Sequence, residues 1–256
     1  MLNLIKTECY KLGTSKLFLI LLSITFALNT AFIAAGGIVT KVFSQGQPVQ
    51  ATELSQVLVN PFAMGLLMIP MFISAVSFLS LDFTGGYVKN IAGQLPDRGS
   101  MVISKYVVIG LHNLIFFVVA ALSGILGTAI GTGVAFDTAI GAGVLTLLLK
   151  WLLSMALCSI LLFLAVGIGN KVFATIMAVI FASGSLSLLY MGISMGAENI
   201  FKLNGFNLGN YLPDSLIGSV NVADNTLVVN GIIVSVVFIA LFVVQSYITF
   251  KKKDVK

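Results

Sequence analysis

Charge is scarce in this chain of 256 residues. Only 9% of the residues are charged and 58% are hydrophobic, whereas an ordinary soluble domain carries roughly 25% charged residues. The scarcity comes from six long runs without Asp, Glu, Lys or Arg. These are residues 17–40, 54–81, 106–136, 151–170, 172–197 and 225–250. An α-helix needs about 20 largely apolar residues to cross a bilayer, so the composition excludes an ordinary soluble fold and predicts six membrane spans.

The uncharged runs favour helices over strands. A membrane-spanning β-strand is only about 10 residues long and alternates in polarity, whereas these runs are continuously apolar. We therefore predict an all-α, polytopic membrane protein with a single domain over residues 1–256. The predicted spans lie approximately at residues 17–40, 58–81, 106–131, 151–170, 172–195 and 228–250.

Acidic residues are absent from all six predicted spans. Ion-coupled carriers usually place such residues there as a relay, so the sequence gives no sign of that energy source. A phosphate-binding loop of the form G-x-x-x-x-G-K-[ST] is also absent. The two cysteines, Cys9 and Cys158, lack metal-ligand spacing and a plausible disulfide geometry. We expect no catalytic residue, metal or cofactor in this chain, and an energy source in another protein.

The basic residues predict the orientation, because cytoplasmic loops are enriched in Lys and Arg. With the N-terminus inside, all but three of the 14 basic residues lie in the cytoplasm, the exceptions being Lys41, Lys150 and Lys202. Both termini are therefore predicted to be cytoplasmic. Basic residues that border membrane segments are topological anchors attracted to lipid headgroups, and we expect no nucleic-acid partner.

Residues 1–16 have the pattern of an amphipathic helix at the inner membrane surface. Leu2, Ile5, Cys9 and Leu12 recur at helical spacing. The charged side chains of the segment are Lys6, Glu8, Lys11 and Lys16. Two roles fit this pattern: an anchor that orients the first span, and a contact with a cytoplasmic partner.

Charge is concentrated again in residues 82–104, the first cytoplasmic loop of the predicted topology. Its glycines favour turns, and a loop of this length can present a docking surface to a soluble protein; an ordinary solvated loop is the alternative. The residues singled out for partner contact are Asp82, Gly85, Gly86, Lys89, Asn90, Asp97, Arg98 and, at the start of the next span, Lys105. The tight turn at Asn170 and Lys171 is a second, smaller contact point.

Polar residues inside the spans are the candidates for a translocation path. His112 and Asn113 lie together in the third span, where they either line a path or bond a neighbouring helix. Ser183 and Ser187 in the fifth span give it a mildly polar face. A serine hydrolase would also need a serine near the histidine, but nothing in the spacing favours that chemistry.

Two regions on the predicted outer side contain further short elements. Residues 138–149 form either a re-entrant or interfacial piece or an extension of the fourth helix, and the sequence does not separate these alternatives. The outer loop, residues 196–224, is expected to contain a short re-entrant helix. Gly127 and Gly192 each begin a G-x-x-x-G motif, which allows two helix backbones to approach closely.

Three motifs resemble those of the membrane subunit of ABC-2-type transporters, and the similarity covers essentially the whole chain. It is greatest for the small permeases of Gram-positive bacteria that export peptides or confer immunity to bacteriocins, such as phenol-soluble modulin exporters. The motifs are Glu8-x-x-Lys11 before the first span, Asp82-x-x-Gly85-Gly86-x-x-Lys89-Asn90, and Pro96-Asp97-Arg98 followed by Lys105.

The resemblance implies a six-helix half-transporter in the plasma membrane. Such a subunit pairs with a second copy or a related permease and docks cytoplasmic ATPase subunits, which bind ATP and magnesium. Residues 1–16 would then be the elbow helix and residues 82–104 the coupling loop. This matches an uncharged bundle that has no nucleotide loop of its own.

The resulting hypothesis is an exporter permease for amphipathic peptides or toxins, powered by a separate ATPase. Apolar helix faces with scattered serine, threonine and phenylalanine suit an amphipathic peptide or a lipid-like molecule better than a small ion. A sodium or small-molecule drug efflux permease is an alternative within the same family. A membrane sensor or assembly subunit without transport of its own is the alternative outside it.

Overall fold

The computed structural model describes residues 2–44, 49–60, 68–84, 99–202, 206–222 and 224–252. These residues are nearly all helical, as predicted. The helices are α1 (Leu2–Thr14), α2 (Lys16–Phe43), α3 (Leu54–Val59), α4 (Met68–Thr84), α6 (Ser100–Ile130), α7 (Ile140–Leu162) continued by the π-helix η3 (Phe163–Ile168), α8 (Lys171–Ser183), α9 (Ser187–Phe201), the 3-10 helix η4 (Leu208–Tyr211), α10 (Pro213–Ser219) and α11 (Asn225–Lys252). The two short strands β1 (Thr52–Glu53) and β2 (Val134–Ala135) pair in parallel.

Four of the described helices are long and apolar enough to cross a membrane: α2, α6, α7 with η3, and α11. They coincide with four of the six predicted spans. The span predicted at 58–81 overlaps the shorter apolar helix α4, and residues 61–67 lie outside the described residues. The span predicted at 172–195 corresponds to α8 and α9, which together pass the same test but are bent by 70°.

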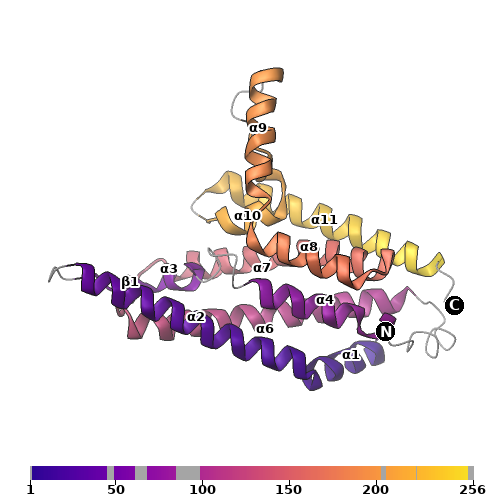
Figure 1. Cartoon of the computed structure of the whole chain (residues 1–256), viewed down its shortest axis with the longest axis horizontal. Coiled ribbons are helices and arrows are strands. Elements are labelled where there is room, and N and C mark those ends of the chain that lie inside the picture. Colours follow the sequence, from indigo (N-terminus) through magenta and orange to yellow (C-terminus); the bar gives the residue numbers. More distant parts are fainter. Residues whose placement is uncertain are drawn as a thin grey trace.

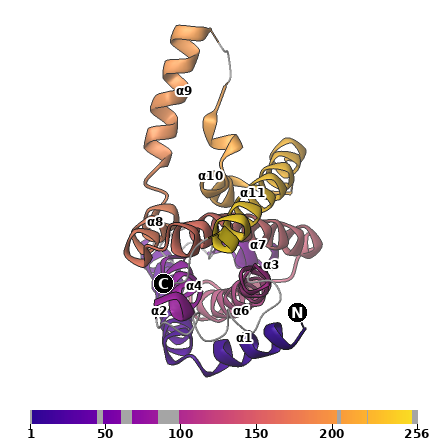
Figure 2. The ribbon, with the colours of Figure 1, turned by 90° about the vertical axis from the view of Figure 1, so that its right-hand side faces the viewer.

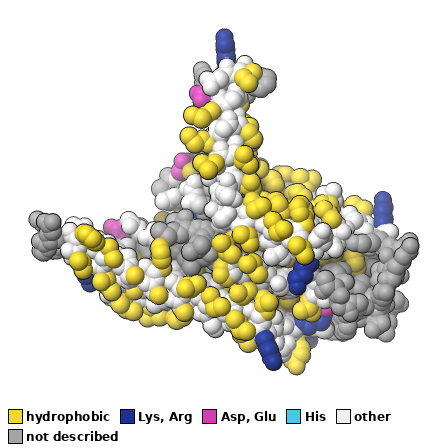
Figure 3. Space-filling model, viewed as in Figure 1, with side chains coloured by type: hydrophobic (Ala, Val, Ile, Leu, Met, Phe, Trp, Pro, Cys, Tyr) yellow, Lys and Arg dark blue, Asp and Glu magenta, His cyan; other side chains and the backbone are white. Residues whose placement is uncertain are grey.

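The long helices form a bundle in which α2 packs on α6, α7 on α11, and α4 on α8. Figure 1 shows α1 and the C-terminal end of α11 at the same end of this bundle. Apolar side chains cover much of the flank seen in Figure 3. Leu28 in α2 is 56% exposed and Leu241 in α11 is 60% exposed, as expected where lipid instead of water surrounds the helices.

The crossing of α2 and α6 depends on glycine. A Cβ atom added to Gly37 would lie 2.6 Å from the Cα of Gly131, and one added to Gly127 would lie 2.9 Å from Ile33. The motif that begins at Gly127 therefore brings two backbones together, as predicted. The motif that begins at Gly192 does not, because a Cβ there meets no described atom within 4 Å.

The expected fifth span is not one continuous helix. Gly184 adopts φ +65° and separates α8 from α9, a conformation that glycine adopts with little cost. Figures 1 and 2 show α9 projecting away from the bundle. Residues 196–224, predicted as an outer loop with a short helix, contain the short helix α10, which buries Leu216 and Ile217 in the core.

The structure distinguishes between the two alternatives for residues 138–149, a re-entrant or interfacial piece and an extension of the fourth helix. Helix α7 begins at Ile140 and continues without a break through Leu162, so this stretch extends the fourth helix. Lys150 consequently lies ten residues inside the helix and is 1% exposed. The adjacent Trp151 is half-buried and donates its indole N–H to the carbonyl oxygen of Gly110 in α6 at 3.1 Å.

Candidate functional site: a buried charge cluster

Three helices bring four charged side chains to one point. Glu8 and Lys11 lie three residues apart on α1, a spacing that places both on one face of a helix. Asp82 lies in the last turn of α4, and Lys105 lies in the second turn of α6. We call these four residues the charge cluster.

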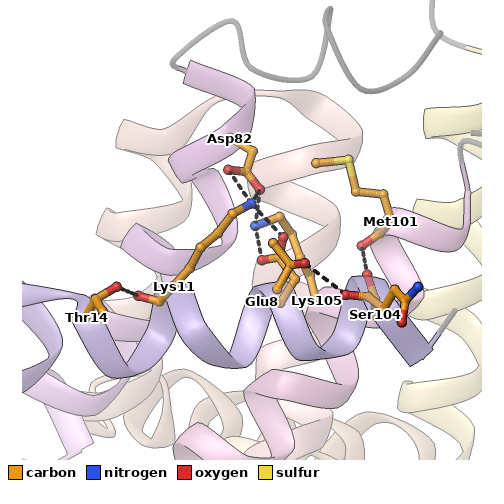
Figure 4. Close-up of polar contacts among 9 residues, drawn as sticks. Glu8, Lys11, Thr14, Asp82, Met101, Ser104 and Lys105 are labelled. Atoms are coloured by element: carbon orange, nitrogen blue, oxygen red, sulfur yellow. Dashed lines mark hydrogen bonds and ion pairs between the residues drawn. The ribbon is translucent and has the colours of Figure 1, made fainter. Parts of the chain in front are cut away.

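Each lysine of the charge cluster contacts both carboxylates (Figure 4). The Nζ of Lys105 lies 2.7 Å from Oδ2 of Asp82 and 3.0 Å from Oε2 of Glu8. The Nζ of Lys11 lies 2.8 Å from Oε1 of Glu8 and 3.1 Å from Oδ2 of Asp82. The four formal charges of these residues cancel.

Three of the four residues of the charge cluster are buried, and Lys11 is half-buried, with its side chain 21% exposed. Lys105 is fully enclosed, and Glu8 and Asp82 are 3% and 2% exposed. The ammonium of Lys105 also lies 4.8 Å from the ring centroid of Phe78. Burial alone would lower the pKa of Lys11, but the hydrogen bonds and charges of Glu8 and Asp82 outweigh it and raise the pKa. Desolvated charges are tolerated only when paired in this way.

The charge cluster joins α1 to α4 and α6, the helices that precede and follow residues 85–98. Asp82 lies two residues before the end of α4 and Lys105 five residues after the start of α6. From α1, Lys11 contacts Asp82 and Glu8 contacts Lys105. From the sequence, each of these four residues was predicted separately to contact a partner or the membrane. The structure points them toward one another (Figure 4).

Of the other residues predicted to contact a partner, six lie outside the described residues. They are Gly85, Gly86, Lys89, Asn90, Asp97 and Arg98. The second predicted contact point is described and accessible: Asn170 and Lys171 are exposed. Asn170 also caps α8, since its side-chain oxygen accepts the backbone N–H of Phe173 at 3.0 Å. Lys6 of α1 is exposed as well. Lys16, predicted as part of the same helix, is exposed but is the first residue of α2, because Ser15 caps α2 and separates the two helices.

The four residues of the predicted translocation path do not form one path. His112 and Asn113 are fully buried. His112 contacts Ser74 of α4 through Nε2 at 3.0 Å, and Asn113 donates to Ser154 of α7 at 3.1 Å. These contacts are the interhelical bonds of the alternative interpretation. Ser74 and Ser154 could not be identified from the sequence, because a serine in an apolar run does not indicate which residue it will contact.

Ser183 and Ser187 lie elsewhere, at the break between α8 and α9. Both are exposed and line a cavity of about 200 Å³ together with Asp214 of α10. Asp214 accepts a hydrogen bond from the hydroxyl of Tyr190 in α9 at 2.8 Å. Among the described residues, no three His, Cys, Asp or Glu side chains are grouped to hold a metal ion.

Comparison with known proteins places the chain in a family. No curated protein matches it. A family model described as ABC-2 family transporter protein matches residues 4–185. This range contains most of α1, the charge cluster and four complete predicted spans. The match covers more than half of the chain and agrees with the apolar helical bundle, so this integral membrane protein belongs to the ABC-2 transporter family.

Proposed function

We propose that this chain is the permease subunit of an ATP-driven exporter whose ATP hydrolysis takes place in a separate cytoplasmic subunit. Membership of the ABC-2 family supports a partner of this general kind. The observation that supports the proposal further is the charge cluster, because it joins α1, the proposed elbow helix, to the helices on either side of the proposed coupling loop.

In the proposed mechanism the partner ATPase contacts residues 85–98 and the turn at Asn170 and Lys171. Closure of the ATPase pair on ATP would displace the loop. Because Asp82 and Lys105 are each bonded to α1 as well as to each other, the elbow helix and the adjoining ends of α4 and α6 would move together. Buried packed contacts transmit such displacements as a unit.

The same proposal includes six membrane crossings with both termini in the cytoplasm. The location of α1 and the C-terminal end of α11 at one end of the bundle supports this topology. A crossing near α4 would use residues 58–81, and one at the bent pair would use α8 with part of α9. A second permease copy or a related permease would complete the transporter.

Amphipathic peptides or toxins are the proposed substrates, in the plasma membrane of a Gram-positive bacterium. Apolar faces interrupted by isolated hydroxyl groups support this choice. Sodium or drug efflux is the second candidate, and it would lead to ATP-dependent movement of an ion or a small molecule without peptide export.

The test compares a loop variant with a distant control in proteoliposomes that contain the chain and its ATPase. In Lys89→Ala/Arg98→Ala we expect ATPase binding and ATP-dependent peptide uptake to fall together, while the purified chain keeps its melting temperature. Lys41→Ala, which removes an exposed lysine at the far end of α2, should behave as wild type. Uptake without any ATPase, or full ATPase binding by the loop variant, would show that the docking proposal is wrong.

A further inference from the structure

Asp214 is a buried acid that has no basic partner in the described part of the chain. It is 8% exposed, near the start of α10. Its carboxylate accepts hydrogen bonds from the hydroxyl of Tyr190 at 2.8 Å and from backbone N–H groups of α10. These donors are neutral, and the ion pairs among the described residues all involve Glu8 or Asp82. Because a buried charge without a counter-charge is costly, a cation from outside the chain would stabilise the carboxylate.

The carboxylate of Asp214 lines the cavity of about 200 Å³ at the break between α8 and α9. Figures 1 and 2 show α10 beside this break. Three serines share the wall with Asp214, namely Ser183, Ser187 and Ser215. The hydroxyl of Ser183 donates to the carbonyl oxygen of Ile180 at 3.0 Å, whereas the hydroxyls of Ser187 and Ser215 have no partner among the described residues. The wall therefore offers a carboxylate and hydroxyl oxygens that can accept further hydrogen bonds.

The remaining side chains of this cavity are apolar. They are Met68 of α4, Phe181 and Ala182 of α8, and Ile217 of α10. The volume is several times the roughly 30 Å³ that one water molecule occupies in the liquid, so the cavity is larger than a bare inorganic ion requires. An inorganic ion would also gain nothing from the apolar walls. A carboxylate beside apolar side chains instead matches an ammonium group on an aliphatic stem, which is the chemistry of a lysine side chain.

We propose that this cavity binds a lysine side chain of an amphipathic peptide. The ammonium would donate hydrogen bonds to Asp214, Ser187 and Ser215 and supply the missing positive charge, and the aliphatic stem would contact Phe181 and Ile217. The identity of the carrier rests on the proposed function, in which such a peptide is exported. Helix α10 belongs to the predicted outer region, so the cavity would hold the peptide on the side where it is released.

The test measures peptide binding to the purified full-length chain in phosphatidylcholine nanodiscs, whose headgroups carry no N–H donor. ATP and the ATPase are absent, and binding to empty nanodiscs is subtracted. An N-terminally acetylated amphipathic peptide with free lysines is compared with the same peptide after acetylation of its lysines. Wild type should bind the free-lysine peptide about tenfold more tightly, the size expected for a hydrogen bond to a charged group. In Asp214→Asn the two peptides should bind equally.

Two further variants separate this cavity from general attraction of a basic peptide to acidic residues. Glu198→Gln removes an exposed acid of α9 that does not line the cavity and should keep the tenfold preference. Ser187→Ala/Ser215→Ala keeps every charge but removes two acceptors, and it should bind the free-lysine peptide about threefold more weakly. The comparison of the two peptides on wild type requires no substitution, so it decides the question even if Asp214→Asn does not fold.

Three outcomes would overturn the proposal. They are equal binding of the two peptides by wild type, an unchanged preference in Asp214→Asn, and loss of peptide binding when phosphatidylethanolamine is added to the nanodiscs, which would assign the cavity to a lipid headgroup. The proposed function fails separately. ATP-dependent peptide uptake without a lysine preference would reject only the cavity site, and lysine-dependent binding without ATP-dependent uptake would reject only the exporter.

Discussion

Lys105 and Asp82 form a 2.7 Å ion pair although they lie on different helices, α6 and α4, on either side of residues 85–98. Glu8 and Lys11 extend this contact to α1, because each lysine contacts both acids. Three segments that are separate in the sequence are thus held at a single point beneath the surface.

Breaking the charge cluster should destabilise the protein strongly. Lys105→Met leaves Glu8 and Asp82 buried with only Lys11 to balance them, and removing one partner of a buried pair costs about 3–5 kcal/mol. We expect a clear fall in the melting temperature in detergent. Lys16→Met removes an exposed lysine near the cluster and should change the free energy of unfolding by less than about 0.5 kcal/mol.

A compensating variant shows whether charge balance is the cause. Lys105→Met combined with Asp82→Asn removes one charge of each sign, leaving Glu8 paired with Lys11 at 2.8 Å. The double variant should therefore be more stable than Lys105→Met alone. If the second substitution adds a further loss instead, the packing of these side chains and not their charge holds the three helices together.

The apolar runs predicted most of the helices, because the length needed to cross a bilayer is read directly from the sequence. They could not predict the break at Gly184, where a glycine among serines in an apolar run resembles any small packing residue. The members of the charge cluster were identifiable as rare charges beside membrane segments. Their pairing was not, because Glu8 and Lys105 are 97 residues apart and only the fold brings them together.

The close crossing of α2 and α6 predicts a sharp contrast between neighbouring glycines. In Gly37→Val the new side chain would overlap the backbone of Gly131, and overpacking of this kind costs about 1–3 kcal/mol or more. In Gly36→Val it meets no described atom within 4 Å, and the helix should be nearly unaffected. Melting temperatures of the two variants provide the measurement, and equal values would contradict the observed crossing.

His112 is expected to serve helix packing and not passage of a substrate. His112→Phe would remove the partner that the hydroxyl of Ser74 now has at 3.0 Å. It would also leave the side-chain oxygen of Asn113 with only the weak thiol donor of Cys158 at 3.9 Å. The cost of such unsatisfied buried groups is about 1–3 kcal/mol each. We expect a lower melting temperature with transport per folded molecule retained. Loss of transport at an unchanged melting temperature would instead favour the translocation path.

Asp214 predicts a dependence of stability on pH. Burial raises its pKa above the usual 3.8, and the hydrogen bonds from Tyr190 and from backbone N–H groups lower it by less. The folded protein therefore binds the proton more tightly than the unfolded chain does, so stability rises as pH falls through the raised pKa toward 3.8 and declines as pH increases. Asp214→Asn lacks this titration. The difference in melting temperature between wild type and Asp214→Asn should shift in favour of wild type as pH is lowered from neutral, and a difference independent of pH would contradict the assignment.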